Sequence, residues 1–276
     1  MRTLFHRGLL SAWLVFCASS LHGQERSASN WPRQFVHDAG NVLAGTGHVL
    51  SNPLRWRSKD WAIFGSVLAG TFAISFADEE VNRFFQRNQS RTGDKLASFG
   101  VQCGEPRTAV LLTGGLYLSG LVLDSDWLRE TCVTLSASLL ASGAVQYPVK
   151  IASGRARPHV GRGHKEFDFF HGAEAYSSFF SGHAMVAMVF SHTLARRLQP
   201  LPAKLLLYSV GTLGGAARLY GEDHWLSDVT LGAIFAIANV NSAAQGLAEQ
   251  RSHSQVGSRQ WCVFASARGL HTTVAW

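Results

Sequence analysis

The sequence has few charged residues for its length. Only 16% of its 276 residues are charged, against roughly 25% in an ordinary soluble domain, while 46% are hydrophobic. This balance is typical of a membrane protein or of an unusually buried helical core. No polar or Gly/Pro-rich linker separates two apolar regions, so one main domain is expected.

Cysteines are also few, and basic runs are missing. The cysteines beyond the N-terminal segment, Cys103, Cys132 and Cys262, are odd in number and lack metal-site spacing, which argues against a disulfide scaffold. The net charge is +7, but Lys and Arg form no run with interleaved aromatics of the kind that binds nucleic acid. They lie between apolar segments, so we expect a membrane or a phosphorylated substrate as partner and no nucleic acid.

The N-terminal residues 1–23 have the order of a secretory signal. Arg2 and Arg7 precede an apolar stretch from Gly8 to Ala18, and small and polar residues follow it. We therefore predict export, with an uncleaved anchor as the alternative. Residues 24–60 are polar and aromatic without a long periodic run, and we interpret them as an extracytoplasmic extension.

Six apolar segments predict an all-α fold, a six-helix bundle that occupies residues 61–247. Several segments have only sixteen to eighteen residues, near the lower limit for a bilayer core of about 30 Å, so the bundle is expected to be membrane-embedded or membrane-associated. A soluble bundle is the alternative. Their many small residues allow close helix packing. The segments are about 61–77, 108–123, 132–149, 184–198, 203–220 and 225–247.

Two further stretches flank or interrupt the apolar segments. Residues 78–107 balance acidic and basic side chains and have apolar positions at helical spacing, which predicts an amphipathic helix near the surface. The tail, residues 248–276, is Thr- and Val-rich in its second part and predicts a short irregular or β-prone segment.

Polar patches between the apolar segments hold the candidate functional residues. The first, KIASGRARP, ends the third segment and contains Lys150 and Arg157. With Arg218 further along the chain, it supplies two guanidinium groups and one ammonium group, which together can neutralise a phosphate. A single Lys or Arg is more often solvated, so the prediction depends on the combination.

The second patch is Ser181-Gly182-His183, at the expected start of the fourth helix. Ser181 can cap that helix, and the free amides at a helix start, which Gly182 leaves accessible, form an anion site. An ordinary cap without a ligand is the alternative. His183 would lie beside the anion and donate a proton to a leaving group, or would simply be a buried histidine.

The third patch, RLYGEDHWLSD, precedes the sixth segment. His224 and Asp228 are four residues apart and share a helix face if that helix begins near His224, so the carboxylate is expected to orient the imidazole as a nucleophile. Such a pair alone is more often a surface contact. No third ligand accompanies it, so no metal is predicted. We interpret Glu222 and Asp223 as the solvated or capping turn that presents His224.

The three patches in this order resemble a known signature. K-x6-R-P, then S-G-H, then R-x5-H-x3-D is similar to the three-part signature of the type 2 phosphatidic acid phosphatase and vanadium haloperoxidase superfamily, over about residues 61–247. Phe180 stands where the family usually has Pro, and Ala217 stands where it usually has Ser. Neither position is charged or nucleophilic in the expected chemistry, so these departures concern substrate preference and rate.

The resemblance implies a bacterial phosphatase that needs no cofactor. Its substrate would be a lipid phosphate or diphosphate, such as phosphatidic acid, phosphatidylglycerol phosphate or a polyprenyl diphosphate, cleaved through a phosphohistidine at His224. Asp228 would support His224, and His183 would protonate the leaving group. The phosphate would be bound by Lys150, Arg157, Arg218, Ser181 and Gly182. A soluble periplasmic acid phosphatase and, further off, a vanadium-dependent haloperoxidase are the alternatives.

The sequence also raises the question of which side of the membrane the site faces. We expect a membrane-associated protein of the bacterial cell envelope with a periplasmic site. An exported N-terminus followed by an odd number of crossings before Lys150 would instead place the site on the cytoplasmic side. An interfacial first segment or a bundle resting on the membrane would remove this conflict.

Overall fold

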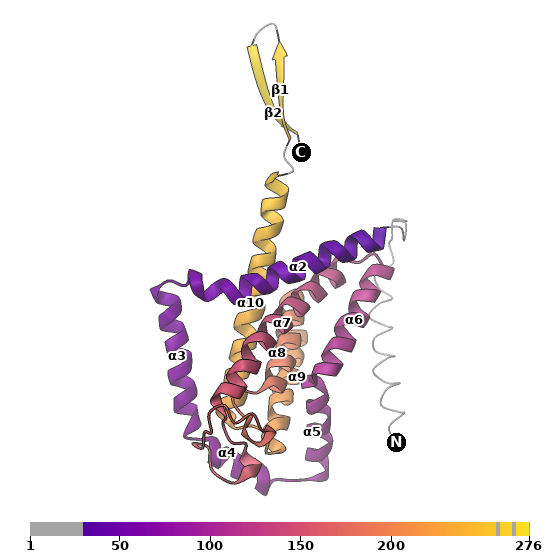
Figure 1. Cartoon of the computed structure of the whole chain (residues 1–276). Helices are drawn as coiled ribbons and strands as arrows, with labels where there is room; N and C mark the ends of the chain where they lie inside the picture. Colours follow the sequence, from indigo (N-terminus) through magenta and orange to yellow (C-terminus); the bar gives the residue numbers. More distant parts are fainter. Residues whose placement is uncertain (1–29, 258–259, 267–268, 276) are drawn as a thin grey trace.

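A computed structural model of the chain describes residues 30–257, 260–266 and 269–275. Within these residues the protein is a helical bundle with one β-hairpin near the C-terminus (Figure 1). The signal-like segment, residues 1–23, lies outside them. The six-helix prediction is confirmed by α3 (Ser58–Ser75), α6 (Pro106–Val122), α7 (Asp126–Ser153), α8 (Gly182–Arg197), α9 (Leu201–Tyr220) and α10 (Leu226–Gly257).

The β-prone tail is also confirmed. Helix α10 continues past the expected end at residue 247, and the antiparallel strands β1 (Gln260–Ser266) and β2 (Gly269–Ala275) follow it. The amphipathic stretch 78–107 is helical as predicted, but as two helices, α4 (Asp78–Arg87) and α5 (Arg91–Gly104). Ser90 separates them, and its side chain caps α5 by accepting a hydrogen bond from the Gly93 amide.

A helix that the sequence pattern did not predict lies across one end of the bundle (Figure 1). This helix, α2 (Trp31–Ser51), packs against α7 and α10 and continues into the 3₁₀ turn η3 (Asn52–Arg55). Asp38 of α2 is buried, accepts a hydrogen bond from the Tyr117 hydroxyl at 3.0 Å and lies 3.0 Å from Nε of Arg129. A helix in this stretch is therefore held by a specific polar contact as well as by packing.

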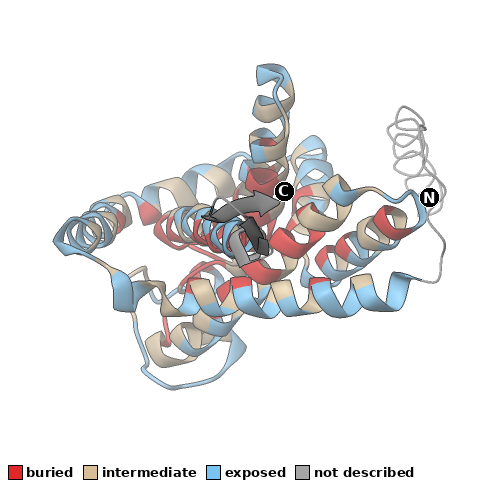
Figure 2. Cartoon of the chain, turned by 90° about the horizontal axis from the view of Figure 1, so that it is seen from above, coloured by how far each residue is buried: buried red, intermediate tan, exposed pale blue. Residues whose placement is uncertain are grey.

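The hydrophobic core lies between α7, α8 and α10. Leu135, Val189 and Val240, one from each helix, are fully buried, and buried residues gather on these central helices in Figure 2. Close approach depends on small residues, as expected. At Gly214 of α9, a Cβ atom would stand 2.5 Å from the Ala187 Cβ of α8, well inside van der Waals contact.

Several helices fit a membrane. Helices α7 and α10 are long and apolar enough to cross one, and α3 and α4 qualify together as a pair bent by 51°. Large apolar side chains also face outward, for example Phe72 on α3 and Leu111 on α6, which are 66% and 75% exposed. Such apolar surface fits a membrane-associated protein.

The polar patches converge at the end of the bundle opposite α2. Helices α7 and α9 end there, α8 and α10 begin there, and α4 lies beside them (Figure 1). The loop of residues 154–181, which contains the 3₁₀ turns η4 (Pro158–Val160) and η5 (Glu174–Tyr176), closes this end. Residues more than 70 positions apart in the sequence therefore form one site.

Candidate active site

The first patch is shaped by the end of α7. Gly154 terminates the helix in the left-handed conformation, with φ of 54°, and its amide donates to the Lys150 carbonyl. A Cβ atom at this position would collide with the Asp168 carbonyl, so glycine is required. The chain then turns, and it places Lys150 of the last helical turn and the buried Arg157 at the same end of the bundle.

The second patch is held against the start of α10. Ser181 is the N-cap of α8, and its hydroxyl accepts a hydrogen bond from the Ala184 amide at 3.3 Å. The Ser181 amide donates to the Asp228 carbonyl at 3.1 Å. Gly232 permits this approach, because a Cβ there would stand 2.6 Å from the Ser181 carbonyl oxygen. The α8 N-terminus and its amides are thus fixed beside the third patch.

The cations of the three patches surround His224. This histidine is only 2% exposed. Burial lowers the pKa of His224 well below its usual value, and the charges of Lys150, Arg218 and Arg157 lower it further. The imidazole is therefore neutral near pH 7, as a nucleophile requires.

Two of these cations have unsatisfied donors. The Nε atoms of Arg157 and Arg218 are buried and have no hydrogen-bond partner in the described part of the chain. Buried charged donors are normally paired, since leaving one unpaired costs roughly 1–3 kcal/mol or more. Two such donors beside one neutral histidine are the expected feature of an anion site.

His224 is oriented by a main-chain carbonyl. Its Nδ1 lies 2.7 Å from the carbonyl oxygen of Ser178. Because a carbonyl can only accept a hydrogen bond, Nδ1 carries the proton and Nε2 keeps its lone pair. The structure thereby selects the tautomer that attacks through Nε2.

Asp228 does not contact the imidazole as the sequence pattern suggested. Within the described residues no hydrogen bond joins the two side chains. Its carboxylate instead accepts from the Ser178 hydroxyl at 2.6 Å and from the Trp225 amide at 3.1 Å. Asp228 thus holds the two backbone segments that flank and orient His224, and its influence on the imidazole is indirect.

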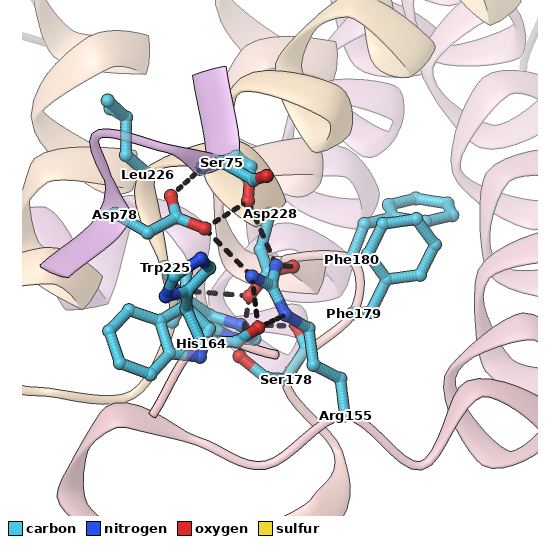
Figure 3. Close-up of polar contacts among 12 residues, drawn as sticks. Ser75, Asp78, Arg155, His164, Ser178, Phe179, Phe180, Trp225, Leu226 and Asp228 are labelled. Carbon is cyan, nitrogen blue, oxygen red and sulfur yellow. Dashed lines mark hydrogen bonds and ion pairs between the residues drawn. The ribbon is translucent and has the colours of Figure 1, made fainter. Parts of the chain in front are cut away.

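A buried ion network completes the support of Asp228 (Figure 3). Arg155 lies between two carboxylates, 2.6 Å from Oδ1 of Asp228 and 2.8 Å from Oδ2 of Asp78. It also donates to the Ser227 hydroxyl and the His164 carbonyl. All three nitrogens of its guanidinium group are engaged, so Arg155 is committed to structure and has no donor group left for a ligand.

Asp223 lies between the two arginines that have free donors. Its Oδ1 is 3.2 Å from Nη1 of Arg157, and its Oδ2 is 2.9 Å from Nη2 of Arg218. Asp223 lies in a turn as expected, but its side chain is only 24% exposed and bridges the two arginines, so it has a role that the sequence did not indicate. Glu222 points elsewhere and accepts a hydrogen bond from the Asn82 amide.

His183 lies one residue into α8, beside Glu105. Its Nε2 is 3.3 Å from Oε2 of Glu105. Burial and the charge of Arg218 lower the pKa of His183, whereas Glu105 raises it. An anion that neutralised Arg218 would remove one of the two lowering causes and favour the protonated, donating form.

Sequence reasoning missed four residues that shape the site: Asp78, Arg155, Ser178 and Asp223. One signal was available. Arg155 and Arg157 are two apart in an extended segment, marked by the bridge between Arg155 and Phe167. In an extended segment, residues two apart point to the same side, so the spacing alone did not show that Arg155 and Arg157 have different partners. Contacts from α4 and α10 hold Arg155 away from the ligand.

Comparison with known proteins finds a family model that matches part of the chain and solved structures of similar fold. The sequence model of the PAP2 superfamily matches residues 131–250, which contain every residue of the three patches. The chain is similar in structure to LpxE of Aquifex aeolicus, with a TM-score of 0.50, 18% identity and coverage of 61% of this chain and 94% of that one. It is also similar to a transmembrane PAP2 type phosphatidylglycerolphosphate phosphatase of Bacillus subtilis, with a TM-score of 0.46, 17% identity and coverage of 70% and 98%. No curated protein matches the chain.

Proposed function

We propose that the chain, whose residues 131–250 match the sequence model of the PAP2 superfamily, is a phosphatase that hydrolyses a lipid phosphate or diphosphate through a phosphohistidine on His224. The observation that carries this proposal is the pair of unpartnered Nε atoms on Arg157 and Arg218, which lie beside a neutral, oriented imidazole. Phosphoryl transfer needs chiefly positioning and charge stabilisation, and these groups supply both.

The reaction proceeds in two displacements at phosphorus. The lone pair on Nε2 of His224 attacks in line, an N–P bond forms, and the bond from phosphorus to the leaving oxygen breaks. His183 donates its proton to that oxygen. A water molecule then attacks the phosphohistidine, His183 takes a proton from it, the N–P bond breaks, and inorganic phosphate leaves. His224 returns to its neutral form.

Charge on the transferring group is balanced by the three cations. Lys150, Arg157 and Arg218 bind the phosphoryl oxygens together with the amides at the start of α8, where Ser181 is the cap and Gly182 keeps the approach open. Asp228 acts as a positioning residue through Ser178 and Trp225. No metal or other cofactor is needed for these steps.

A substrate with an apolar tail follows from the surroundings of the site. The candidate spans α7 and α10 both reach the catalytic end, and the outer surfaces of α3 and α6 expose large apolar side chains. Because α7 ends and α10 begins beside the cationic cluster, we infer that a lipid held along these helices presents its phosphate to that cluster. A soluble phosphate ester would gain nothing from this apolar surface.

Phosphate release from purified protein in detergent tests the proposal. We expect His224→Ala to abolish release from lipid phosphates while the protein still unfolds cooperatively, and His171→Ala, an exposed histidine of the same loop region, to retain it. Release that survived His224→Ala would refute the histidine mechanism. Equal rates on p-nitrophenyl phosphate and on lipid phosphates would favour the soluble acid phosphatase instead.

The side of the membrane that the site faces has its own test. A periplasmic site places α2, at the opposite end of the bundle, on the cytoplasmic side if the helices between them cross the membrane. That conflicts with the extracytoplasmic assignment of residues 24–60, so both expectations hold only if these helices do not cross. A reporter fused at Lys165, in the loop that closes the site, distinguishes the two sides. Periplasmic activity of the reporter supports the proposal, and cytoplasmic activity reverses the orientation.

A further inference from the structure

A basic cavity, apart from the catalytic cluster, lies at the end of the bundle that α2 crosses. It has a volume of about 220 Å³ and is formed by α7, α8 and α10. Thr134, Thr193 and Val240 line its buried part, and guanidinium groups surround the rest. A single water needs roughly 10–15 Å³ of such volume, so the cavity has room for a much larger polar group. Its guanidinium groups belong to Arg196, Arg197 and Arg251.

The charges in this cavity do not cancel. Glu130 pairs with both Arg197 and Arg251, at 2.9 and 2.7 Å. Among the residues that the structure describes, Arg196 donates only to the neutral amide oxygen of Asn241, at 2.6 Å. Three guanidinium groups therefore face one carboxylate, which leaves a net charge of two positives. Basic residues are common in the last turn of a helix, but Arg196 and Arg197, in the last turn of α8, reach Asn241 of α10 and Glu130 of α7.

Thr193, which lines the cavity, has a buried hydroxyl without a hydrogen-bond partner in the described part of the chain. Thr193 is 2% exposed, and its Oγ1 makes no hydrogen bond within the described residues. Buried threonines in the neighbouring helix satisfy theirs by donating to the carbonyl four residues earlier, as Thr131 does at 2.6 Å and Thr134 at 3.0 Å. Because an unsatisfied buried hydroxyl is costly, this group indicates a ligand in the cavity.

We propose that this cavity binds a phosphate group, at a site separate from the catalytic one. Several planar guanidinium donors and a hydroxyl around one small space suit an anion with several oxygens, and guanidinium groups bind phosphate oxygens through paired donors. The group comes either from the headgroup of an anionic phospholipid or from free inorganic phosphate. This site does not depend on the proposed catalytic function.

The test compares variants that remove the donors with a variant that removes equal charge elsewhere. Arg196→Gln/Arg251→Gln removes two cavity cations, and Thr193→Val removes the hydroxyl at nearly constant shape. The control is Arg33→Gln/Arg55→Gln, which removes two exposed cations from α2 and η3 at the same end of the molecule. All four proteins keep the catalytic cluster, so any phosphate bound there is common to them.

In the first arm, thermal unfolding in detergent is followed against inorganic phosphate at constant ionic strength. A ligand that binds the folded state raises Tm. If free phosphate is the source, the cavity variants need about tenfold more phosphate for the same rise, a loss equal to ~1.4 kcal/mol of binding, whereas the control behaves as wild type. Thr193→Val should also leave Tm unchanged or higher without phosphate, since it removes an unsatisfied group.

In the second arm, the proteins are placed in nanodiscs of phosphatidylcholine with phosphatidylglycerol, and retained lipids are counted by native mass spectrometry. If a headgroup is the source, wild type and control retain one more phosphatidylglycerol than the cavity variants. The proposal is overturned if Arg196→Gln/Arg251→Gln and Thr193→Val both keep the wild-type rise of Tm with phosphate and the wild-type number of retained phosphatidylglycerol molecules. It is also overturned by a Thr193→Val protein that is destabilised without phosphate yet keeps its whole phosphate response.

Discussion

Asp223 offers the sharpest test of how the catalytic cluster binds phosphate. Its carboxylate lies between Arg157 and Arg218, with contacts of 3.2 and 2.9 Å, so it competes with phosphate for both guanidinium groups, and we expect an incoming phosphate to displace it from at least one of them. The free enzyme is thus stabilised by contacts that the bound enzyme loses. Replacing Asp223 by Asn weakens the free state more than the bound state, and phosphate should bind more tightly.

The size of this effect follows from the contacts. A hydrogen bond to a charged group contributes about 1.5–3 kcal/mol. The Asp223 side chain is 24% exposed, so solvent screening reduces that figure. We take ~1.4 kcal/mol, which corresponds to about a tenfold lower inhibition constant for a competing phosphate analogue. The turnover number should change less, because the pair is broken before the chemical step.

Vanadate inhibition of p-nitrophenyl phosphate hydrolysis measures the effect directly. Asp223→Asn should lower the inhibition constant, and Glu222→Gln should leave it unchanged, since Glu222 contacts Asn82 and neither arginine. An inhibition constant that stays the same or rises in Asp223→Asn would refute the reasoning. It would mean that Asp223 positions the guanidinium groups in the bound state as well.

Two further predictions concern stability. Replacing Arg155 by Gln leaves the buried carboxylates of Asp78 and Asp228 unpaired and should destabilise the protein by roughly 3–5 kcal/mol, seen as a lower unfolding midpoint in detergent, and adding Asp78→Asn should restore part of it. An unchanged midpoint in Arg155→Gln would contradict the buried network. The pKa of His224 is lowered in the folded state, so the unfolded chain binds the extra proton as pH falls below about 6.5. Stability should therefore be full above that pH and decline below it, and His224→Gln should flatten the decline between pH 5 and 8; an equal slope in both proteins would exclude His224 as its source.

The bundle could be predicted because its helices are continuous apolar runs. Helix α2 could not be predicted, because its apolar residues lie on two sides of the helix, one buried and one exposed. Val49 faces α7 and α10 and is buried, whereas Val36 and Leu43 are each 70% exposed on the outer side. Gly40, Gly45 and Gly47 interrupt the sequence further. A helix with apolar residues on both sides gives no simple periodic pattern, and its packing partners were decided by tertiary contacts.

The candidate site was predicted as a set of residues but not as a set of contacts. The order of Lys150, Arg157, His183, Arg218, His224 and Asp228 indicated that cations and histidines would meet, and the structure brings them to one end of the bundle. The sequence did not show which carboxylate pairs with which cation. That depends on Asp78, which α4 contributes from 77 positions before Arg155.

The allocation of carboxylates explains why only some of the cations are available to a ligand. Arg155 is neutralised by Asp228 and Asp78, which are 0% and 1% exposed and are held further by Ser178 and Ser227. Breaking such a buried pair costs several kcal/mol, so phosphate cannot recruit Arg155. Arg157 and Arg218 share the partly exposed Asp223, and Arg157 also pairs with the exposed Glu174 at 3.4 Å; a dianion with more charge and more oxygens can displace both carboxylates. The aspartate that the sequence pattern paired with His224 thus acts by occupying Arg155, and this leaves the other two arginines to bind the substrate.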